Sequence, residues 1–235
     1  MKNLILASTS TVYGSAYLDY LKPTLARHFK QLSELLFIPY ARPGGCSYED
    51  YTKVVATAFA ALDISVRGIH EYSDPKVAIQ KAQGIFVGGG NTFVLVKQLY
   101  EEELLTPLKT AIETGTPYLG TSAGSNICGV SMQTTNDMPI VAVPSYKTLG
   151  CIPFNINAHY LDPDPKSTHK GETREERIQE FHTYNTTRVL GLREGSWLDV
   201  RGDRIVLGGP YSLRYFSPDK QAVEIEAGAN LSELL

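Results

Sequence analysis

Short apolar runs alternate with helix-like stretches through the first half of the chain, and this alternation constrains the fold more than any other feature. Because a helix separates each strand from the next, neighbouring strands are expected to run parallel, with helices covering both faces of the sheet. The sequence therefore predicts an α/β fold built on a largely parallel sheet. The expected strands are Asn3–Ala7, Leu35–Tyr40, Ile64–His70, Gly84–Val87 and Pro117–Leu119, and the expected helices are Tyr17–Leu36, Tyr51–Leu62, one opened by Ser73–Pro75, Thr92–Tyr100 and Glu101–Thr114.

The second half of the chain is richer in strands. A hairpin turn is expected at Arg201–Asp203, where glycine stands between two alternating runs. The sequence contains no internal repeat, low-complexity segment or obvious linker, so residues 1–235 are expected to form a single domain. The expected strands here are Val189–Leu192, Trp197–Val200, Arg204–Leu207 and Ala222–Glu226.

Composition excludes several classes of function. The net charge is −3 and there is no basic block, so nucleic acid is not an expected partner. No apolar run approaches the roughly 20 residues of a membrane span, and the run after Lys2 is too short for a signal peptide. Cys46, Cys128 and Cys151 lie far apart without metal-ligand spacing. A cytoplasmic protein with no metal or cofactor is expected, and a homodimer stays open.

Residues 120–124 form the motif Gly-x-Ser-x-Gly, with a short apolar run before it and a small-residue stretch after it. A strand, a glycine-flanked serine and a helix in this order are the context of a nucleophile elbow. The glycines allow a sharp turn that leaves the serine hydroxyl exposed. We therefore expect Ser122 to be a nucleophile that forms a covalent acyl-enzyme.

A serine nucleophile needs a base, which is usually a histidine oriented by a carboxylate. His159 is the first candidate, since it follows the apolar stretch Ile152–Ile156, and His169 is the second; the alternative for His159 is a structural role in its turn. His28 and His182 lie in charged helical stretches and are expected to be solvated. The candidate acids, which spacing alone does not rank, are Asp137, Glu194, Asp162 and Asp164.

A glycine-rich turn, Gly88–Asn91, follows one strand and precedes a helix. It lacks the later glycine of a dinucleotide-binding fingerprint and the Gly-Lys-Ser/Thr of a P-loop. With a serine elbow on the following strand, an oxyanion role is the stronger interpretation. The amides of Gly89, Gly90 and Ala123 are then expected to face the developing oxyanion. The alternative is a tight turn that needs positive φ, and both can be true together.

A helix is expected to begin near Thr173, which forms a Thr-x-x-Glu capping box with Glu176. Arg174 stands in the first turn of this helix, where the helix dipole disfavours a cation. An arginine kept there suggests a carboxylate ligand, and the alternative is a solvated helix start.

Taken together, these segments resemble the family of peptidase E, the α-aspartyl dipeptidases, which also contains cyanophycinase. The matching stretches occur in the family's order over nearly the whole chain. They are Phe86–Thr92, Gly120–Asn126, Thr134–Pro139, Asn155–His159, His169–Arg177, Glu194–Trp197 and Leu207–Pro210.

The resemblance implies a fold like that of class I glutamine amidotransferases, with Ser122 as nucleophile and His159 as base. It offers two positions for the acid, Asp137 and Glu194, and does not rank them. Arg174 matches an arginine that binds the aspartyl side chain of the substrate. The implied activity is hydrolysis of dipeptides with an N-terminal α-aspartate, and these peptides are the expected partners.

Three other functions remain to be weighed. A cyanophycinase-like enzyme cleaving β-aspartyl-arginine units would need acidic groups in its pocket, which the Arg174 match disfavours. A non-catalytic binding protein on the same scaffold would tolerate loss of the catalytic residues, yet all of them are present. A glutamine amidotransferase would need cysteine in the elbow, and Cys128 lies six residues downstream of Ser122.

Overall fold

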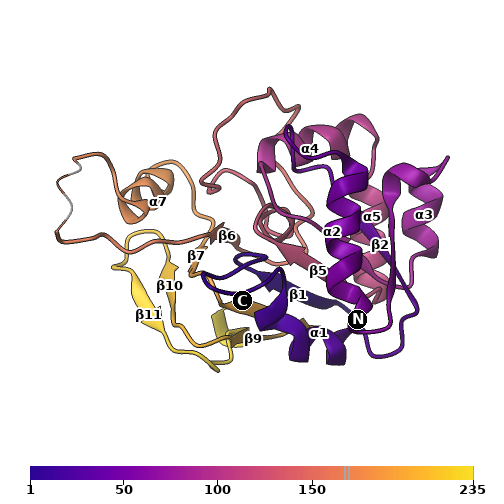
Figure 1. Ribbon diagram of the computed structural model, residues 1–235. Coiled ribbons are helices and arrows are strands. Elements are labelled where there is room, and N and C mark those ends of the chain that lie inside the picture. Colours follow the sequence, from indigo (N-terminus) through magenta and orange to yellow (C-terminus); the bar gives the residue numbers. More distant parts are fainter. Residues whose placement is uncertain (167, 169, 235) are drawn as a thin grey trace.

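The computed structural model describes residues 1–166, 168 and 170–234, and its centre is a seven-stranded sheet (Figure 1). The strand order is β3-β2-β4-β5-β1-β8-β9, and the pairs from β3 to β1 are parallel, as the sequence predicts. Strands β8 and β9 add an antiparallel edge. The strands are β1 Asn3–Ala7, β2 Glu34–Ile38, β3 Ser65–Gly68, β4 Ile85–Val87, β5 Tyr118–Thr121, β8 Trp197–Arg201 and β9 Arg204–Gly208.

Helices cover both faces of this sheet, which confirms the predicted layering. Along β1, Ile5 packs with α1 and α2 on one face, whereas Leu4 and Leu6 pack with α4 and α5 on the other. The helix expected to open at Ser73–Pro75 is confirmed, and Asp74 caps it, since its side chain accepts a hydrogen bond from the Val77 amide. The helices are α1 Lys22–His28, α2 Tyr48–Ala60, α3 Pro75–Lys81, α4 Thr92–Glu101, α5 Leu105–Thr114, α6 Ala123–Asn126 and α7 Arg174–His182, with short 3₁₀ turns at Asp19–Leu21, Ile69–Glu71 and Ser232–Leu234.

A second sheet of four strands carries most of the C-terminal part, with α7 beside it (Figure 1). Its order is β11-β10-β7-β6, and only the β6–β7 pair is parallel. This parallel pair matters for function, because the residues that follow β6 and β7 emerge at one edge. The strands are β6 Asn155–Ala158, β7 Val189–Leu192, β10 Leu213–Phe216 and β11 Val223–Ile225.

Two sequence-based expectations are wrong in detail. The helix expected at Tyr17–Leu36 is only Lys22–His28, because the chain turns after Phe29 and enters β2 at Glu34. The buried strand is apolar on both faces, and such a run cannot be told from a helix by periodicity. Strand β10 was not expected; it is four residues long, with buried ends and half-exposed middle residues, and therefore lacks strict alternation.

The carboxyl ends of β4, β5 and β1 lie at one edge of the large sheet, as parallel pairing requires. The glycine turn follows β4, Ser122 follows β5 and Ser8 follows β1. Loops at this edge are where α/β proteins place their chemistry. Among the described residues, no helix has the length and apolar character needed to cross a membrane.

His28 is buried, contrary to the expectation of a solvated side chain. Its Nε2–H donates to the carbonyl oxygen of Tyr118 at 3.1 Å, which ties α1 to the strand that leads to Ser122. Burial, together with the positive charge of Arg201, lowers the pKa of His28 from 6.5 to about 3, although the hydrogen bond opposes this shift. The folded protein therefore holds His28 neutral where the unfolded chain binds a proton.

We expect the free energy of unfolding to fall as the pH drops from 6.5 toward 3, with His28 contributing about 1.4 kcal/mol per pH unit below 6.5. The sign follows from the lowered pKa, since protons favour the unfolded chain in this window. Urea unfolding of the wild type and of His28→Gln at several pH values measures it. The variant should show the shallower slope, and equal slopes would contradict the assignment.

Candidate active site

Ser122 lies at a sharp turn between β5 and α6, in a backbone conformation that is strained for a residue with a side chain (φ 51°, ψ −111°). Its amide donates to the carbonyl oxygen of Ala7 at 3.0 Å. The flanking glycines make the turn feasible. A Cβ at Gly124 would lie 2.1 Å from the carbonyl oxygen of Val87, and one at Gly120 would lie 2.5 Å from that of Gly124. The predicted elbow thus depends on both glycines.

His159 connects Ser122 to Glu194 through its two ring nitrogens. Nε2 lies 2.9 Å from Ser122 Oγ, and Nδ1 lies 2.5 Å from Glu194 Oε1. Because a carboxylate only accepts, the compatible arrangement has Nδ1–H donating to Glu194 and the Ser122 hydroxyl donating to Nε2. This is the order of groups in a serine, histidine and acid triad. The structure therefore brings these three sequence-predicted residues together.

Ser8 holds the backbone that carries His159, and the sequence analysis did not single it out. The buried Ser8 hydroxyl accepts from the His159 amide at 2.9 Å and donates to the carbonyl oxygen of Leu192 at 2.7 Å. His159 has a φ of 55°, a left-handed conformation that this contact helps to fix. Since Leu192 precedes Glu194 by two residues, one hydroxyl links the segments of the base and the acid. The only sequence signal is a polar residue directly after a buried strand.

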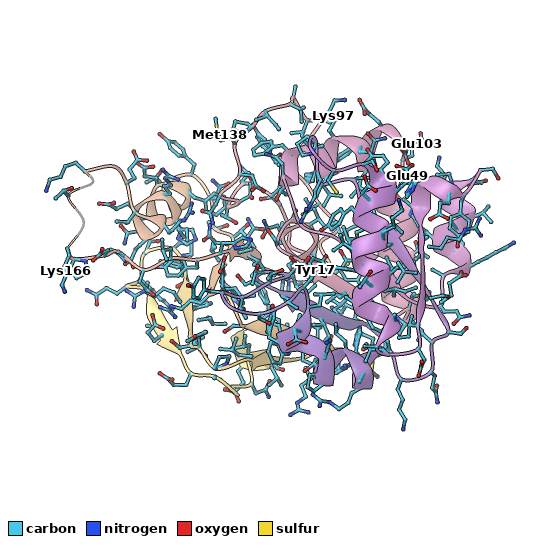
Figure 2. The ribbon with its side chains drawn as sticks, viewed as in Figure 1. Tyr17, Glu49, Lys97, Glu103, Met138 and Lys166 are labelled. Atoms are coloured by element: carbon cyan, nitrogen blue, oxygen red, sulfur yellow. The ribbon has the colours of Figure 1, made fainter. Side chains whose placement is uncertain are left out.

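Asp137 lies elsewhere, at the N-terminus of α4. Its Oδ2 accepts from the Thr92 amide at 2.8 Å, from Thr92 Oγ1 at 2.5 Å and from Thr135 Oγ1 at 2.8 Å. The next residue, Met138, is exposed on the outside of the molecule (Figure 2). Among the described residues, no hydrogen bond joins Asp137 to His159. Of the two acids that the sequence left unranked, only Glu194 contacts the base.

The glycine turn after β4 lies against the nucleophile. A Cβ at Gly89 would be 3.1 Å from Ser122 Cβ, and Gly90 has a φ of 146° with the Ala41 backbone too close for a side chain. Tyr51 Oη donates to the Gly89 carbonyl oxygen at 3.2 Å and so orients this peptide. The amides of Gly89, Gly90 and Ala123 have no acceptor among the described residues. Unpaired amides beside Ser122 suit an oxyanion, and that role stays a prediction.

Arg174 begins α7, directly after the predicted capping box, which is confirmed. Thr173 Oγ1 accepts from the Glu176 amide at 3.1 Å, and Glu176 Oε2 accepts from the Thr173 amide. Arg174 itself is half-buried and makes no ion pair with any described residue. Burial and nearby Arg177 lower the pKa of Arg174, while the charge of Asp137 raises it. A partly desolvated cation without a partner is suited to a carboxylate ligand.

The remaining candidates do not join the site. Asp162 pairs with Arg193 at 2.7 Å, and His169 lies outside the described residues. Asp164 accepts only from the Lys166 amide. Cys128 is fully buried at the end of α6, and burial raises the pKa of its thiol well above the ordinary value. Within the described ranges, no group of three or more His, Cys, Asp or Glu side chains could hold a metal ion.

Comparison with known proteins identifies relatives over the whole chain. Residues 4–208 match the model of "Peptidase family S51". A protein named "Peptidase E" from Streptomyces coelicolor is 50% identical over 99% of this chain and 95% of its own. A "Probable alpha-aspartyl dipeptidase" of Drosophila melanogaster is 43% identical over 100% of this chain and 98% of its own.

Solved structures share the fold. The crystal structure of a putative peptidase E protein from Listeria monocytogenes has a TM-score of 0.67 and 22% identity, covering 89% of this chain and 98% of that one. A peptidase from an acI-B1 actinobacterium has a TM-score of 0.69 and 15% identity, covering 98% and 96%.

We expect Glu194→Gln to slow labelling of Ser122 by a fluorophosphonate about a hundredfold or more, because glutamine can donate to Nδ1 and favour the wrong imidazole tautomer. Asp137→Asn should cost about tenfold at most, since its carboxylate does not touch His159. Labelling rates by mass spectrometry measure both, with melting temperatures as a folding control. A larger loss in Asp137→Asn would reverse the ranking of the acids.

Proposed function

The chain belongs to peptidase family S51, and we propose that it is a serine dipeptidase that cleaves dipeptides after an N-terminal α-aspartate. The observation that carries this proposal is the hydrogen-bonded series Ser122–His159–Glu194, with the unpaired Arg174 on the helix that follows. The series supports nucleophilic hydrolysis, and the arginine supports selection of an acidic residue.

In the first half of the reaction, Ser122 Oγ attacks the aspartyl carbonyl carbon and its proton passes to His159 Nε2. Glu194 stabilises the imidazolium through Nδ1–H. The tetrahedral intermediate then collapses, the peptide C–N bond breaks, and His159 gives the proton to the leaving amine. The aspartyl group remains as an ester on Ser122.

In the second half, a water molecule attacks the ester carbonyl while His159 Nε2 accepts one of its protons. The C–O bond to Ser122 breaks and His159 returns the proton to Oγ, which releases aspartate and restores the enzyme. In both halves the carbonyl oxygen carries negative charge in the intermediate. The amides of Gly89, Gly90 and Ala123 stabilise it, because Gly89 lies against Ser122, Ala123 follows it in the chain, and none of the three amides has an acceptor among the described residues.

Arg174 selects the substrate by pairing with its β-carboxylate. Partial burial weakens the hydration of the Arg174 guanidinium. A substrate without a β-carboxylate leaves this charge unpaired and therefore binds less well. The charge of Asp137 acts on Arg174. Its three hydrogen bonds hold it at the N-terminus of α4, where the helix dipole also attracts it. Its proposed part is to fix the start of α4, directly after the glycine turn.

The other functions are not favoured. A pocket for a β-aspartyl-arginine unit would present acidic groups free to pair with arginine. In the hollow that Arg174 lines, Asp162 and Glu172 are already paired with Arg193 and Arg177. A purely binding role leaves the aligned Ser122, His159 and Glu194 without a purpose. We also propose a reducing compartment such as the cytoplasm, supported by the three cysteines, all of which are free thiols.

Purified enzyme should hydrolyse Asp-Leu and leave Asn-Leu, Glu-Leu and β-Asp-Leu nearly untouched, and Ser122→Ala should abolish the Asp-Leu activity. Release of leucine measures turnover, and circular dichroism shows whether the variant is folded. Cleavage of β-Asp-Leu in place of Asp-Leu would indicate a cyanophycinase-like β-aspartyl peptidase. Cleavage of none of the four would sink the dipeptidase proposal.

We expect Arg174→Gln to lower kcat/KM for Asp-Leu by on the order of 10²–10³, because the β-carboxylate loses its charged partner. The preference for Asp-Leu over Asn-Leu should shrink in parallel. Arg177→Gln is the matched control, since Arg177 lies one turn later on α7 and pairs with Glu172. An unchanged Asp-to-Asn preference in Arg174→Gln would exclude this arginine as the selector.

A further inference from the structure

A hollow of about 810 Å³, here called the aromatic pocket, lies beside the triad and has no part in the mechanism above. Rings make most of its wall, and one carboxylate lies at its side. Tyr20 and Trp197 form a tilted pair with ring centroids 6.2 Å apart, and Tyr13 and Tyr211 are exposed. The lining includes Tyr13, Tyr20, Glu194, Trp197, Pro210 and Tyr211.

The pocket belongs to the same edge of the sheet as the nucleophile. Strand β8 runs antiparallel to β1, so its first residue, Trp197, pairs with Ala7 at the end of β1 and also with Gly208 at the end of β9. In the sheet order, β4 carries the glycine turn, β5 carries Ser122, and β1, β8 and β9 follow. The proposed oxyanion amides and the aromatic pocket therefore lie on opposite sides of Ser122.

Glu194 connects the pocket to the reaction. It lines the pocket, and its Oε1 contacts His159 Nδ1. Since His159 gives its proton to the leaving amine, the leaving residue departs on the histidine side of Ser122. The pocket shares Glu194 with this histidine, whereas the glycine turn follows β4 and lies on the other side of Ser122 in the sheet order.

The lining decides which side chain fits. No basic residue is among the described residues that line the pocket, so an acidic side chain finds no partner there and meets the charge of Glu194. The Tyr20 hydroxyl already donates to the Thr9 carbonyl oxygen at 2.6 Å and therefore presents its ring to the pocket. Aromatic walls of this kind favour large apolar or aromatic side chains.

We propose that the aromatic pocket binds the side chain of the leaving residue and makes dipeptides with a C-terminal phenylalanine or leucine the preferred substrates. This inference rests on the proposed function, because it assigns the second residue of the same substrate. It names Tyr13 and Tyr211, the two exposed rings of the lining, as determinants of specificity.

The test compares kcat/KM for Asp-Phe, Asp-Leu, Asp-Ala, Asp-Lys and Asp-Glu in the wild type, Tyr211→Ala and Tyr13→Ala. The wild type should prefer Asp-Phe to Asp-Ala by about tenfold or more, as expected for a large group in an apolar pocket. Both variants should lose most of that preference, and Tyr13→Ala should do so while its activity on Asp-Ala stays nearly unchanged. Tyr184→Ala is the control, since Tyr184 is exposed on the segment after α7 and should leave the preference intact.

Two variants are needed because the Tyr211 ring packs against Gly195, next to Glu194, and its removal could disturb the acid. Tyr13 is fully exposed and lacks this contact. The pocket assignment would be overturned if the wild type cleaved all five peptides equally or preferred Asp-Lys. It would also be overturned if Tyr13→Ala lost activity on Asp-Ala and Asp-Phe equally. Those outcomes would not contradict the dipeptidase proposal. Failure to cleave any Asp-Xaa peptide would contradict the dipeptidase proposal, on which the pocket assignment rests.

Discussion

The close approach of backbone to backbone around Ser122 is the constraint on which the rest of the site depends. Gly124 packs against the end of β4, and Gly120 packs against Gly124, at distances that leave no room for a Cβ. This packing holds Ser122 in a conformation that an isolated chain would avoid, with its side chain at the open edge of the sheet. The strain is sustained because the surrounding strands are fully buried.

The second sheet positions His159 and Glu194, which follow its strands β6 and β7. Parallel pairing of β6 with β7 places His159 beside the segment of Glu194, although the two are far apart in the sequence. Ser8, at the end of β1, joins this sheet to the large one through two hydrogen bonds. Ser122 and His159, the proposed nucleophile and base, thus come from different sheets, and the buried Ser8 hydroxyl links the two sheets.

Local backbone features of this protein could be predicted from its sequence, whereas contacts that depend on strand pairing and on distant segments could not. The elbow glycines, the glycine turn and the Thr173 capping box are short patterns whose geometry depends on neighbouring residues. The sequence does not decide between Asp137 and Glu194, because both lie at turns and only the β6–β7 pairing brings Glu194 to His159. The Ser8 contact and the burial of His28 depend on segments distant in the chain, which periodicity does not report.

The central claim is that Ser122 becomes covalently acylated. The most direct measurement is the mass of the enzyme after acid quenching during turnover of an α-aspartyl nitrophenyl ester, whose good leaving group makes loss of the acyl group the slow step. An acyl-enzyme on Ser122 predicts an increase equal to one aspartyl residue, located on the peptide that contains Ser122 and absent from Ser122→Ala. Turnover by the wild type without any adduct, or an adduct that persists in Ser122→Ala, would contradict it.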